Sequence, residues 1–572
     1  MKFLNKKNYI ILFLLTVLLI ESKVFAKESE IQYTKENISN YFSGIISANQ
    51  DYNNEAFNHL KKVKSLKNRH SQFNIEFIRT LVLLEKFNQA FAFSKNVWSE
   101  SEIFFEIDLL LGLDYFIKED YINAEKHFKR LNKISRYNPF FDDFMGNVLI
   151  AWSKATQGNE KDSIKFIEKI PKTYHYFKKI QNIFLQCYFD QDKTQISFEK
   201  LVDDKDYKFS RYNFFLTNFL LYKNKIADAQ KVIEDSRKEY NSNLLIKQTE
   251  IFLSNNNNEK IKDFFNCKNP KDPLAEFFYA IANLYASKGD YKLSNFYLKI
   301  SLFLNKKFLP NKALLAENFY YQKQNALSKN IYHSLKSIGT VYSWHASKNI
   351  ATILLDLKGK KYAVKSLEEE FNLLSHPNFE HYYELANFYK ENEYYKESVK
   401  YYSLALKEIK KDHFLVSKIL DRRGVSFERL GDWENAEKDL IRSLEILPDQ
   451  AHVLNYLAYS WIDKGINLDK GLEMLKKANK LRENDGYIID SLGWAYYAIK
   501  NYSEAELFLQ KAVELLPLDP IINDHYADTL WRLNKNIQAR YFWNHVLKLN
   551  GTEQKLKDDI SKKLIFGITK QL

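Results

Sequence analysis

The hydrophobic and polar positions of this chain follow the spacing of amphipathic helices, and the pattern recurs along the sequence. In residues 485–517, large apolar side chains return three or four positions apart. This spacing predicts two helices, at residues 487–499 and 503–515, joined by a short turn, with Ser503 as the N-cap of the second. Small residues interrupt the apolar faces at fixed places: Gly493, Ala505 and Ala512.

The same helix-pair pattern recurs at a period of about 34 residues, which is typical of a repeat protein and not of one compact core. Successive pairs are expected to begin near residues 275, 309, 344, 379, 417, 451, 486 and 520. Seven of the nine prolines fall at or beside predicted repeat junctions, where loss of a helical hydrogen bond is tolerated.

The repeats share a motif. A small residue is followed three positions later by an aromatic one, then by Gly-Asp-Tyr or a variant at the turn, and then by alanine, leucine or tyrosine, alanine and proline. It is clearest in "DRRGVSFERLGDWENAEKDLIRSLEILP" and "DSLGWAYYAIKNYSEAELFLQKAVELLP". This motif resembles the tetratricopeptide repeat (TPR). The resemblance implies an all-α fold, a TPR-type α-solenoid in which antiparallel helix pairs stack into a right-handed superhelix.

Four segments follow from the pattern and the resemblance. Residues 1–26 are expected to be a signal peptide and residues 27–270 degenerate TPR-like helical repeats. Residues 271–553 are expected to form a regular TPR array, and residues 554–572 a capping helix whose polar face closes the array. Within a repeat, Gly493 and Ala505 are expected where the two helices approach most closely.

The N-terminus has the three parts of a secretory signal. The basic start "MKFLNKKN" precedes the apolar run "YIILFLLTVLLI", and "ESKVFA" carries Val24 and Ala26 at the spacing of a cleavage site. We expect cleavage after Ala26 and export, most plausibly into a bacterial periplasm. The apolar run is short for a membrane span, so an uncleaved anchor is the weaker interpretation. No cysteine lies near the site, so no lipid anchor is expected.

The net charge limits the classes of molecule that the chain could bind, and the cysteine count raises the question of a disulfide. The formal net charge is +13, and removal of residues 1–26, which hold four lysines and one glutamate, leaves +10. An exported basic protein meets acidic polysaccharide, lipid head groups and acidic proteins, so no nucleic acid partner is expected. Charge that merely aids solubility is the favoured interpretation. Cys187 and Cys267 fall in what we interpret as different repeats, so we expect two separate buried thiols, although an oxidising compartment permits a disulfide.

Catalytic chemistry has no clear basis in the sequence. There is no His-Glu-x-x-His, Gly-x-Ser-x-Gly, phosphate-binding glycine-rich loop or Cys-x-x-Cys. His376 and His381, with Glu380 and Glu384 nearby, permit a metal site, but a polar loop is the favoured interpretation. We therefore expect no enzyme activity, no cofactor and no metal.

The resemblance also implies a binding face. In TPR proteins that bind peptides, one stripe of each first helix points into the concave groove. Carried onto the last three repeats, the stripe gives an aromatic floor with carboxylates and one cation. The residues are His452, Asn455, Tyr459, Asp463, Tyr487, Asp490, Trp494, Tyr497, Ile521, Asp524, Asp528, Trp531 and Arg532.

Two questions about this stripe stay open at the level of sequence. Trp494 and Trp531 are equally compatible with exposure in the groove and with packing on the adjacent repeat. Asp490, Asp524 and Asp528 indicate either a basic or amine-bearing ligand or helix-capping roles. The Lys/Asn clamp with which TPR co-chaperones hold a C-terminal carboxylate is not reproduced at these largely acidic positions.

The C-terminal block is similar to the terminal repeats of exported proteobacterial TPR proteins, on the stretches "NYLAYSWID", "DGYIIDSLGWAYY" and "DPIINDHYADTLWR". Some of that group are lipoproteins that act as adaptors for a periplasmic C-terminal processing protease. The resemblance implies a non-catalytic periplasmic scaffold that holds protein partners, such as a protease or a peptidoglycan-remodelling enzyme. The alternative is a component of an envelope-assembly or polysaccharide-export apparatus that contacts acidic polysaccharide or a membrane surface.

Overall fold

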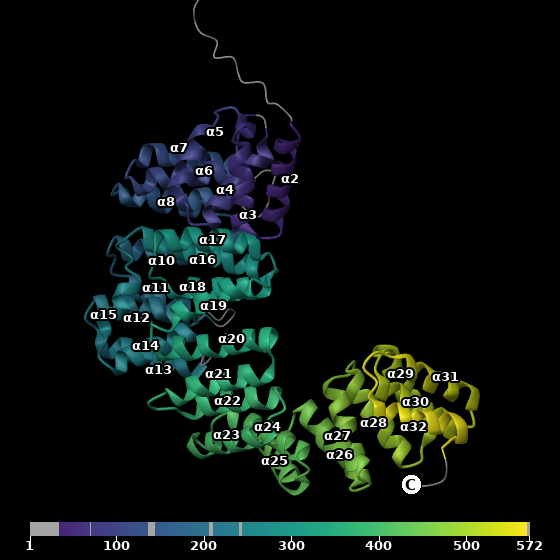
Figure 1. Cartoon of the computed structure of the whole chain (residues 1–572). Helices are drawn as coiled ribbons and strands as arrows, with labels where there is room; N and C mark the ends of the chain where they lie inside the picture. The colour runs from purple at the N-terminus through teal and green to yellow at the C-terminus, as the bar shows by residue number, and fades with distance from the viewer. Residues whose placement is uncertain (1–33, 69, 135–142, 205–209, 240–242, 569–572) are drawn as a thin grey trace, which may run out of the picture. The chain divides into compact units, whose positions relative to one another are not determined.

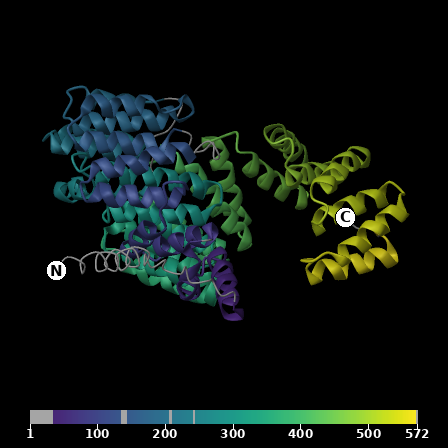
Figure 2. The same cartoon turned by 90° about the horizontal axis from the view of Figure 1, so that it is seen from above.

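The described part of the molecule is helical. A computed structural model of the chain describes residues 34–68, 70–134, 143–204, 210–239 and 243–568. Over these ranges the secondary structure consists of α-helices and 3₁₀ helices, without a strand (Figures 1 and 2). The predicted all-α fold of antiparallel helix pairs is therefore confirmed. The predicted signal peptide, residues 1–26, lies outside the described residues.

The chain divides into two compact units, residues 1–353 and residues 354–572, which we call unit 1 and unit 2. The helices that begin in unit 1 are α2 (Lys35–Asn49), α3 (Asn53–Leu60), η1 (Lys61–Asn68), α4 (Ser71–Leu83), α5 (Phe87–Val97), α6 (Phe105–Ile117), α7 (Tyr121–Ile134), α8 (Met145–Thr156), α9 (Glu160–Glu168), η4 (Lys172–Tyr174), α10 (His175–Tyr188), α11 (Thr194–Val202), α12 (Tyr212–Tyr222), α13 (Ile226–Glu239), α14 (Leu244–Ser254), α15 (Asn258–Phe264), α16 (Lys271–Ser287), α17 (Tyr291–Leu304), α18 (Leu309–Tyr321), α19 (Asn325–Leu335) and α20 (Thr340–Lys358).

Unit 2 contains the remaining helices up to the C-terminal one. Its helices are α21 (Lys360–Asn372), α22 (Phe379–Glu391), α23 (Tyr395–Glu408), α24 (Leu415–Arg429), α25 (Trp433–Ile446), α26 (Ala451–Asp463), α27 (Leu468–Leu481), α28 (Gly486–Ala498), α29 (Tyr502–Leu515), α30 (Pro520–Arg532), α31 (Asn536–Lys548) and α32 (Gln554–Phe566). In both units a first helix pairs with the second helix that follows it, and first helices of successive hairpins, such as α26 and α28, are also in contact.

The repeat starts predicted from the sequence lie within a few residues of the first helices of the hairpins. The first helices of the regular array begin at residues 271, 309, 340, 379, 415, 451, 486 and 520. The prediction of Ser503 as an N-cap is wrong. Helix α29 begins at Tyr502, and its N-cap is Asn501, whose side chain accepts a hydrogen bond from the Glu504 N–H. The turn closes early because Lys500 adopts a left-handed conformation, with a φ of 65°.

Small residues do lie where the paired helices approach closely. A Cβ atom on Gly493 would lie 2.6 Å from Leu509 Cγ of α29 and 3.2 Å from the Leu509 backbone nitrogen. One on Gly424 would lie 3.0 Å from Leu440 Cγ of α25. The gaps in the apolar pattern are therefore packing positions, as the sequence predicts.

Unit 1 departs from a simple stack in which each hairpin contacts only its neighbours in sequence. Helix α4 packs against α17, which lies beside it in space (Figure 1). Lys292 Nζ of α17 lies 3.1 Å from Glu76 Oε2 of α4, although the two residues are 216 positions apart. The rings of Phe87 and Phe303 stack with centroids 4.1 Å apart. The early hairpins of the chain thus rest on hairpins of the regular array.

The same folding-back corrects the prediction of two separate thiols. Cys187 and Cys267 form a disulfide, with Cα atoms 6.0 Å apart. Cys187 is the penultimate residue of α10, whereas Cys267 lies in the loop before α16. Lys268 Nζ donates to the Tyr188 carbonyl oxygen at 2.9 Å, so the two segments also meet beside the disulfide. Separation by 80 residues in sequence did not imply separation in space.

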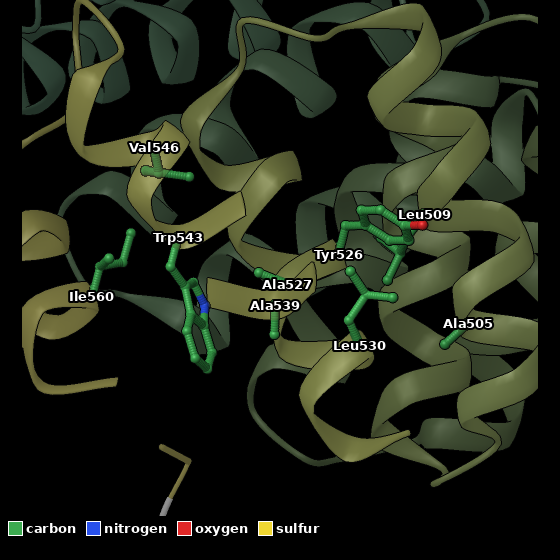
Figure 3. Close-up of a cluster of buried hydrophobic side chains, with 9 residues drawn as sticks. All are labelled: Ala505, Leu509, Tyr526, Ala527, Leu530, Ala539, Trp543, Val546 and Ile560. Carbon is green, nitrogen blue, oxygen red and sulfur yellow. The ribbon is translucent and has the colours of Figure 1, made fainter. Parts of the chain in front are cut away.

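The predicted C-terminal cap is a helix, α32, which packs on α31. Figure 3 shows Ile560 of this helix beside Trp543 of α31 in a cluster of buried side chains that continues into the previous repeats. Ile560 is fully buried, while most of the neighbouring residues of α32 remain exposed. This amphipathic helix therefore covers the last apolar face of the array. Among the described residues, no helix is long and apolar enough to cross a bilayer.

Candidate functional site

A groove of about 920 Å³ runs across the first helices of unit 2. We call it the α24–α28 groove, because α24, α26, α28 and the turns that precede them supply nearly all of its lining. The lining residues are Lys390, Phe414, Leu415, Ser417, Lys418, Asp421, Arg422, Val425, Leu447, Asp449, Gln450, Ala451, His452, Asn455, Tyr456, Leu481, Arg482, Asp485, Tyr487 and Ile488.

The repeat period explains how the sequence builds this lining. The small residue of each first helix, such as Gly493, faces the second helix of its own hairpin. Residues six positions earlier occupy equivalent places in successive repeats, and three of them line the groove: Lys418, His452 and Tyr487. Residues three positions before the small residue include Asp421 and Asn455, which also line it.

Apolar side chains of the groove are unusually open to solvent. Phe414 is 61% exposed, Leu447 is 52% exposed and Tyr487 is 59% exposed. Phe414 stands at the N-cap position of α24, Leu447 at the C-cap of α25 and Tyr487 in the first turn of α28. Three large side chains with exposed apolar surface, two from the α24–α25 hairpin and one from α28, therefore offer anchoring points for another molecule.

The carboxylates of the groove already have partners within the chain. Asp421 Oδ2 lies 2.9 Å from His452 Nε2, which joins α24 to α26. Asp449 Oδ1 lies 2.8 Å from Lys477 Nζ. The Asp485 side chain caps α28 by accepting from the first-turn N–H groups of the helix. The negative charge of this surface is consequently engaged before any partner binds.

The structure divides the sequence-predicted stripe into two parts. Asn455 and Tyr487 line the α24–α28 groove, together with His452. Tyr459 is half-buried, and its ring centroid lies 6.4 Å from that of His525. Asp463, at the end of α26, is exposed and does not belong to the groove lining. Whether any of these residues binds a partner stays a prediction.

The three aspartates that indicated an amine-bearing ligand are buried and paired inside the chain. Lys563 Nζ of α32 lies 2.9 Å from both Asp524 Oδ2 and Asp528 Oδ2. Trp543 Nε1 donates to Asp528 Oδ1 at 3.0 Å. Asp490 Oδ1 lies 3.0 Å from His525 Nδ1. Two of the three aspartates are thus paired with the chain's own Lys563 and the third with His525, and none of the three caps a helix.

The aromatic residues of the last two repeats pack on one another. Trp494 stacks on Tyr497 at 4.5 Å and on His525 at 4.0 Å, so the packing alternative holds for Trp494. Arg532 Nε donates to the Tyr497 hydroxyl at 3.2 Å. Ile521, by contrast, is 45% exposed.

Trp531, the other tryptophan of the stripe, also meets its own chain. Its ring lies 5.4 Å from that of Trp543, and a Cβ on Gly567, just after α32, would come within 2.1 Å of it. The contact with Gly567 shows that the chain beyond α32 covers this tryptophan. The downstream half of the stripe is therefore packed within the C-terminal repeats, and the open groove lies one to two repeats earlier.

Burial and charge shift two titrating groups of the C-terminal cluster. Burial lowers the pKa of His525, but the neighbouring Asp490 carboxylate outweighs it, so the pKa is raised above 6.5. Burial, with the adjacent Asp524 carboxylate, raises the pKa of Asp528 to about 7, against the opposing effects of Lys563 and Trp543. Both groups hold protons more tightly in the folded chain than in the unfolded one.

Lys418, Asp421, Phe414 and Leu447 were missed by the analysis of the sequence. The signal for Lys418 and Asp421 was present, because they hold the stripe positions of the repeat that contains Gly424. Phe414 and Leu447 lie in the turns between hairpins, where the helical period carries no information about direction. Only the packed structure brings them beside the stripe.

The candidate metal residues have a local structural role. His381 is the third residue of α22, and Asn378, the N-cap, accepts from the backbone N–H groups of Glu380 and His381. The Asn378 N–H in turn donates to His381 Nδ1 at 3.2 Å. This capping box starts the helix. Among the described residues, no group of three or more His, Cys, Asp or Glu side chains is placed to hold a metal ion.

A second hollow, of about 610 Å³, lies in unit 1 where α5 meets α17 and α18. Four lysines line it, Lys86, Lys299, Lys306 and Lys312, with Glu85 as the one acidic residue of the lining. Lys299 Nζ pairs with Glu85 Oε1 at 2.5 Å. We call this site the unit 1 lysine hollow.

Comparison with known proteins finds similarity in the C-terminal part of the chain. The tetratricopeptide repeat family model matches residues 489–517, which span α29 and most of α28. The TPR repeat-containing protein PA4667 of Pseudomonas aeruginosa is 33% identical over 99 residues. That alignment covers 17% of this chain and 17% of the relative, so it spans about a sixth of either protein.

Solved structures show weaker global similarity. MamA from Desulfovibrio magneticus covers 32% of this chain and 99% of its own, at 16% identity and a TM-score of 0.28. TTC0263, a TPR protein of Thermus thermophilus, covers 33% of this chain and 99% of its own, at 17% identity and a TM-score of 0.28. The Cut9–Hcn1 hetero-tetramer covers 92% of this chain and 96% of its own, at 12% identity and a TM-score of 0.35.

Proposed function

We propose that this chain, a tetratricopeptide repeat protein, is a non-catalytic scaffold that binds a segment of another protein in the α24–α28 groove. The observation that carries the proposal is the exposure of Phe414, Leu447 and Tyr487 in one hollow formed by consecutive first helices. Large, solvent-exposed aromatic and aliphatic side chains in a concave surface are the usual anchors of protein interfaces.

Recognition would rest on repetition. Successive repeats place Lys418, His452 and Tyr487 at equivalent positions, so that an extended or helical segment meets one such residue per repeat. Each contact is modest, and their number along the groove supplies affinity and register.

We further propose that the chain works in an oxidising, extracytoplasmic compartment, most simply the bacterial periplasm. The disulfide between Cys187 and Cys267 supports this location, since such bonds persist outside the reducing cytosol. The partners in that compartment would be a protease or a peptidoglycan-remodelling enzyme, as the resemblance implies. Cell fractionation, with N-terminal sequencing of the recovered protein, tests the location. A mature chain that begins at Lys27 supports it, and full-length chain in the cytoplasm contradicts it.

The groove is tested by a matched pair of double variants. Phe414→Ala with Tyr487→Ala removes two exposed groove anchors, whereas Ile537→Ala with Tyr541→Ala removes two exposed side chains of α31 outside the groove lining. The captured partner, identified by mass spectrometry from wild-type protein, is then measured against each purified variant by titration. We expect the groove variant to lose about tenfold or more in affinity and the control to bind like wild type. Equal affinity of both variants would refute the groove assignment.

Binding of an acidic polymer is the second candidate function, and the unit 1 lysine hollow favours it. Lys306 and Lys312 make no ion pair with any residue that the structure describes. Lys306→Glu with Lys312→Glu should weaken retention on an immobilised acidic polysaccharide, and Phe414→Ala should not change it. If the lysine variant is retained as strongly as the wild type, and if added salt does not weaken retention, binding of an acidic polymer is ruled out as the function.

A further inference from the structure

We infer that the segment bound in the α24–α28 groove is acidic, with carboxylates interspersed among the apolar side chains that meet the exposed anchors. The inference rests on the proposed function and adds to it the chemistry of the partner. It is carried by the cations of the groove, three of which have no carboxylate partner among the described residues while the fourth, Arg482, is exposed.

The cations of the groove are incompletely paired. Lys390 and Lys418 make no ion pair with a described residue, and Lys418 is exposed on α24. Arg482 follows α27, its side chain is 60% exposed, and its Nη1 atom lies 3.7 Å from Asp485 Oδ2. Arg422 donates to the neutral Asn387 side chain and covers the Tyr383 ring, so it too lacks a carboxylate.

The carboxylates of the groove, unlike its cations, all have partners within the chain. Asp421, Asp449 and Asp485 are engaged by a histidine, a lysine and a helix N-terminus respectively. The charge left over for a partner is therefore positive. An acidic segment would gain ion pairs without breaking these contacts, whereas a basic segment would meet unpaired like charges.

The position of the cations relative to the anchors sets the pattern of the partner. Lys418 is the fourth residue of α24, one helical turn after the exposed Phe414 at the N-cap. Arg482 lies between α27 and α28, shortly before the exposed Tyr487. Two of the three anchors, Phe414 and Tyr487, thus have a cation close to them in sequence and in the same groove. A segment in which apolar and acidic side chains follow one another matches both kinds of site.

The test uses the full mature chain and three labelled synthetic peptides that share the same Leu and Phe residues. The remaining positions are Glu in the first peptide, Gln in the second and Lys in the third. Fluorescence anisotropy measures the affinity of each at low and at physiological ionic strength. We expect the Glu peptide to bind at least about fivefold more tightly than the Lys peptide, with the difference shrinking as salt rises. Equal affinity of the Glu and Lys peptides would overturn the inference.

Charge-reversal variants show whether the groove cations are responsible. Lys418→Glu with Arg482→Glu should weaken the Glu peptide about fivefold or more and should strengthen the Lys peptide. The control, Lys407→Glu with Lys480→Glu, makes the same change of charge at exposed lysines of α23 and α27 outside the groove lining. If the control weakens the Glu peptide as much as the groove variant does, the attraction is a property of net charge and the inference fails.

The two proposals fail in different ways. Loss of binding of all three peptides in Phe414→Ala with Tyr487→Ala, whatever their charge, supports the groove. If all three peptides bind this variant as tightly as they bind the wild type, the proposed function itself is contradicted. Polyglutamate, which offers carboxylates without apolar side chains, is the last probe. If it binds the groove as tightly as the Glu peptide, the partner is a plain polyanion and the inferred protein segment is wrong.

Discussion

A glycine in α28 determines how closely two helices pack. The backbone of Gly493 lies so near α29 that a Cβ atom would come within 2.6 Å of Leu509, which is itself fully buried. Leu509 belongs to the cluster that joins this repeat to the next, so displacing it disturbs more than one hairpin. Position 493 tolerates few larger side chains, because a Cβ atom there would meet the backbone nitrogen of Leu509 as well as its side chain.

Replacing Gly493 with leucine should therefore destabilise the chain by about 1–3 kcal/mol, since the added side chain must push the helices apart. Thermal and denaturant unfolding of the two proteins measures the difference. Ser503→Leu, at an exposed position of α29, is the matched control and should shift stability by less than about 0.5 kcal/mol. Unchanged unfolding of the Gly493 variant would show that the helices are not held at this distance.

Individual residues also mark the limit of what the sequence could predict. The small packing residues follow from a local repeat and were placed correctly. The partners of Asp524 and Asp528 did not follow from it, because Lys563 lies 39 and 35 residues downstream on a helix outside the repeat. Local spacing shows which face a carboxylate occupies and not which distant side chain reaches that face.

At the scale of elements, α32 does more than cover an apolar surface. Through Ile560 it extends the core around Trp543, and through Lys563 it neutralises two buried carboxylates of α30. Breaking a buried ion pair by removing one partner is costly, because the remaining charge stays desolvated. The last repeat and its cap are therefore coupled by charge as well as by packing.

This coupling predicts a pH dependence of stability. The folded-state pKa of His525 is raised above 6.5, and that of Asp528 is raised from 3.8 to about 7. A raised pKa means that the folded chain binds the proton more tightly, so stability falls as pH rises through the window between the two values. For Asp528 that window runs from about 4 to about 7.

The variant Asp528→Asn isolates this effect, because its side chain keeps the size of the original and does not titrate. Relative to the variant, the wild-type chain should lose stability on the order of 1 kcal/mol per pH unit between pH 4 and 7. Unfolding followed by tryptophan fluorescence at several pH values measures both proteins. Parallel pH curves for the two would show that Asp528 does not titrate in this range.

At the scale of the whole molecule, the regular array was predictable and the folding-back of unit 1 was not. The hairpins after residue 271 carry a strong motif, so their first helices were placed within a few residues. The contact between α4 and α17 depends on how small rotations per hairpin add up over many repeats. No local pattern records that sum. The disulfide between Cys187 and Cys267, which joins residues 80 positions apart, was also predicted wrongly.

The disulfide joins residues 80 positions apart, so its removal should destabilise the chain by about 2–5 kcal/mol, mainly by freeing the unfolded state. Cys187→Ala with Cys267→Ala should lower the unfolding temperature, and a reducing agent should lower that of the wild type but not that of the variant. Mass spectrometry of the alkylated protein is the direct check. Two alkylated cysteines in protein purified without a reducing agent would contradict the pairing.

We propose that a protein partner binds in the α24–α28 groove of the whole molecule. Site-specific photo-crosslinking in the producing cells tests it most directly, with a benzophenone amino acid placed at Tyr487 in the groove or at Tyr541 on α31, both of them exposed. We predict a discrete crosslinked protein from position 487, weakened by Lys418→Glu, and none of the same mass from position 541. The same adduct from both positions, or an adduct from position 541 alone, would show that the partner does not bind in the groove.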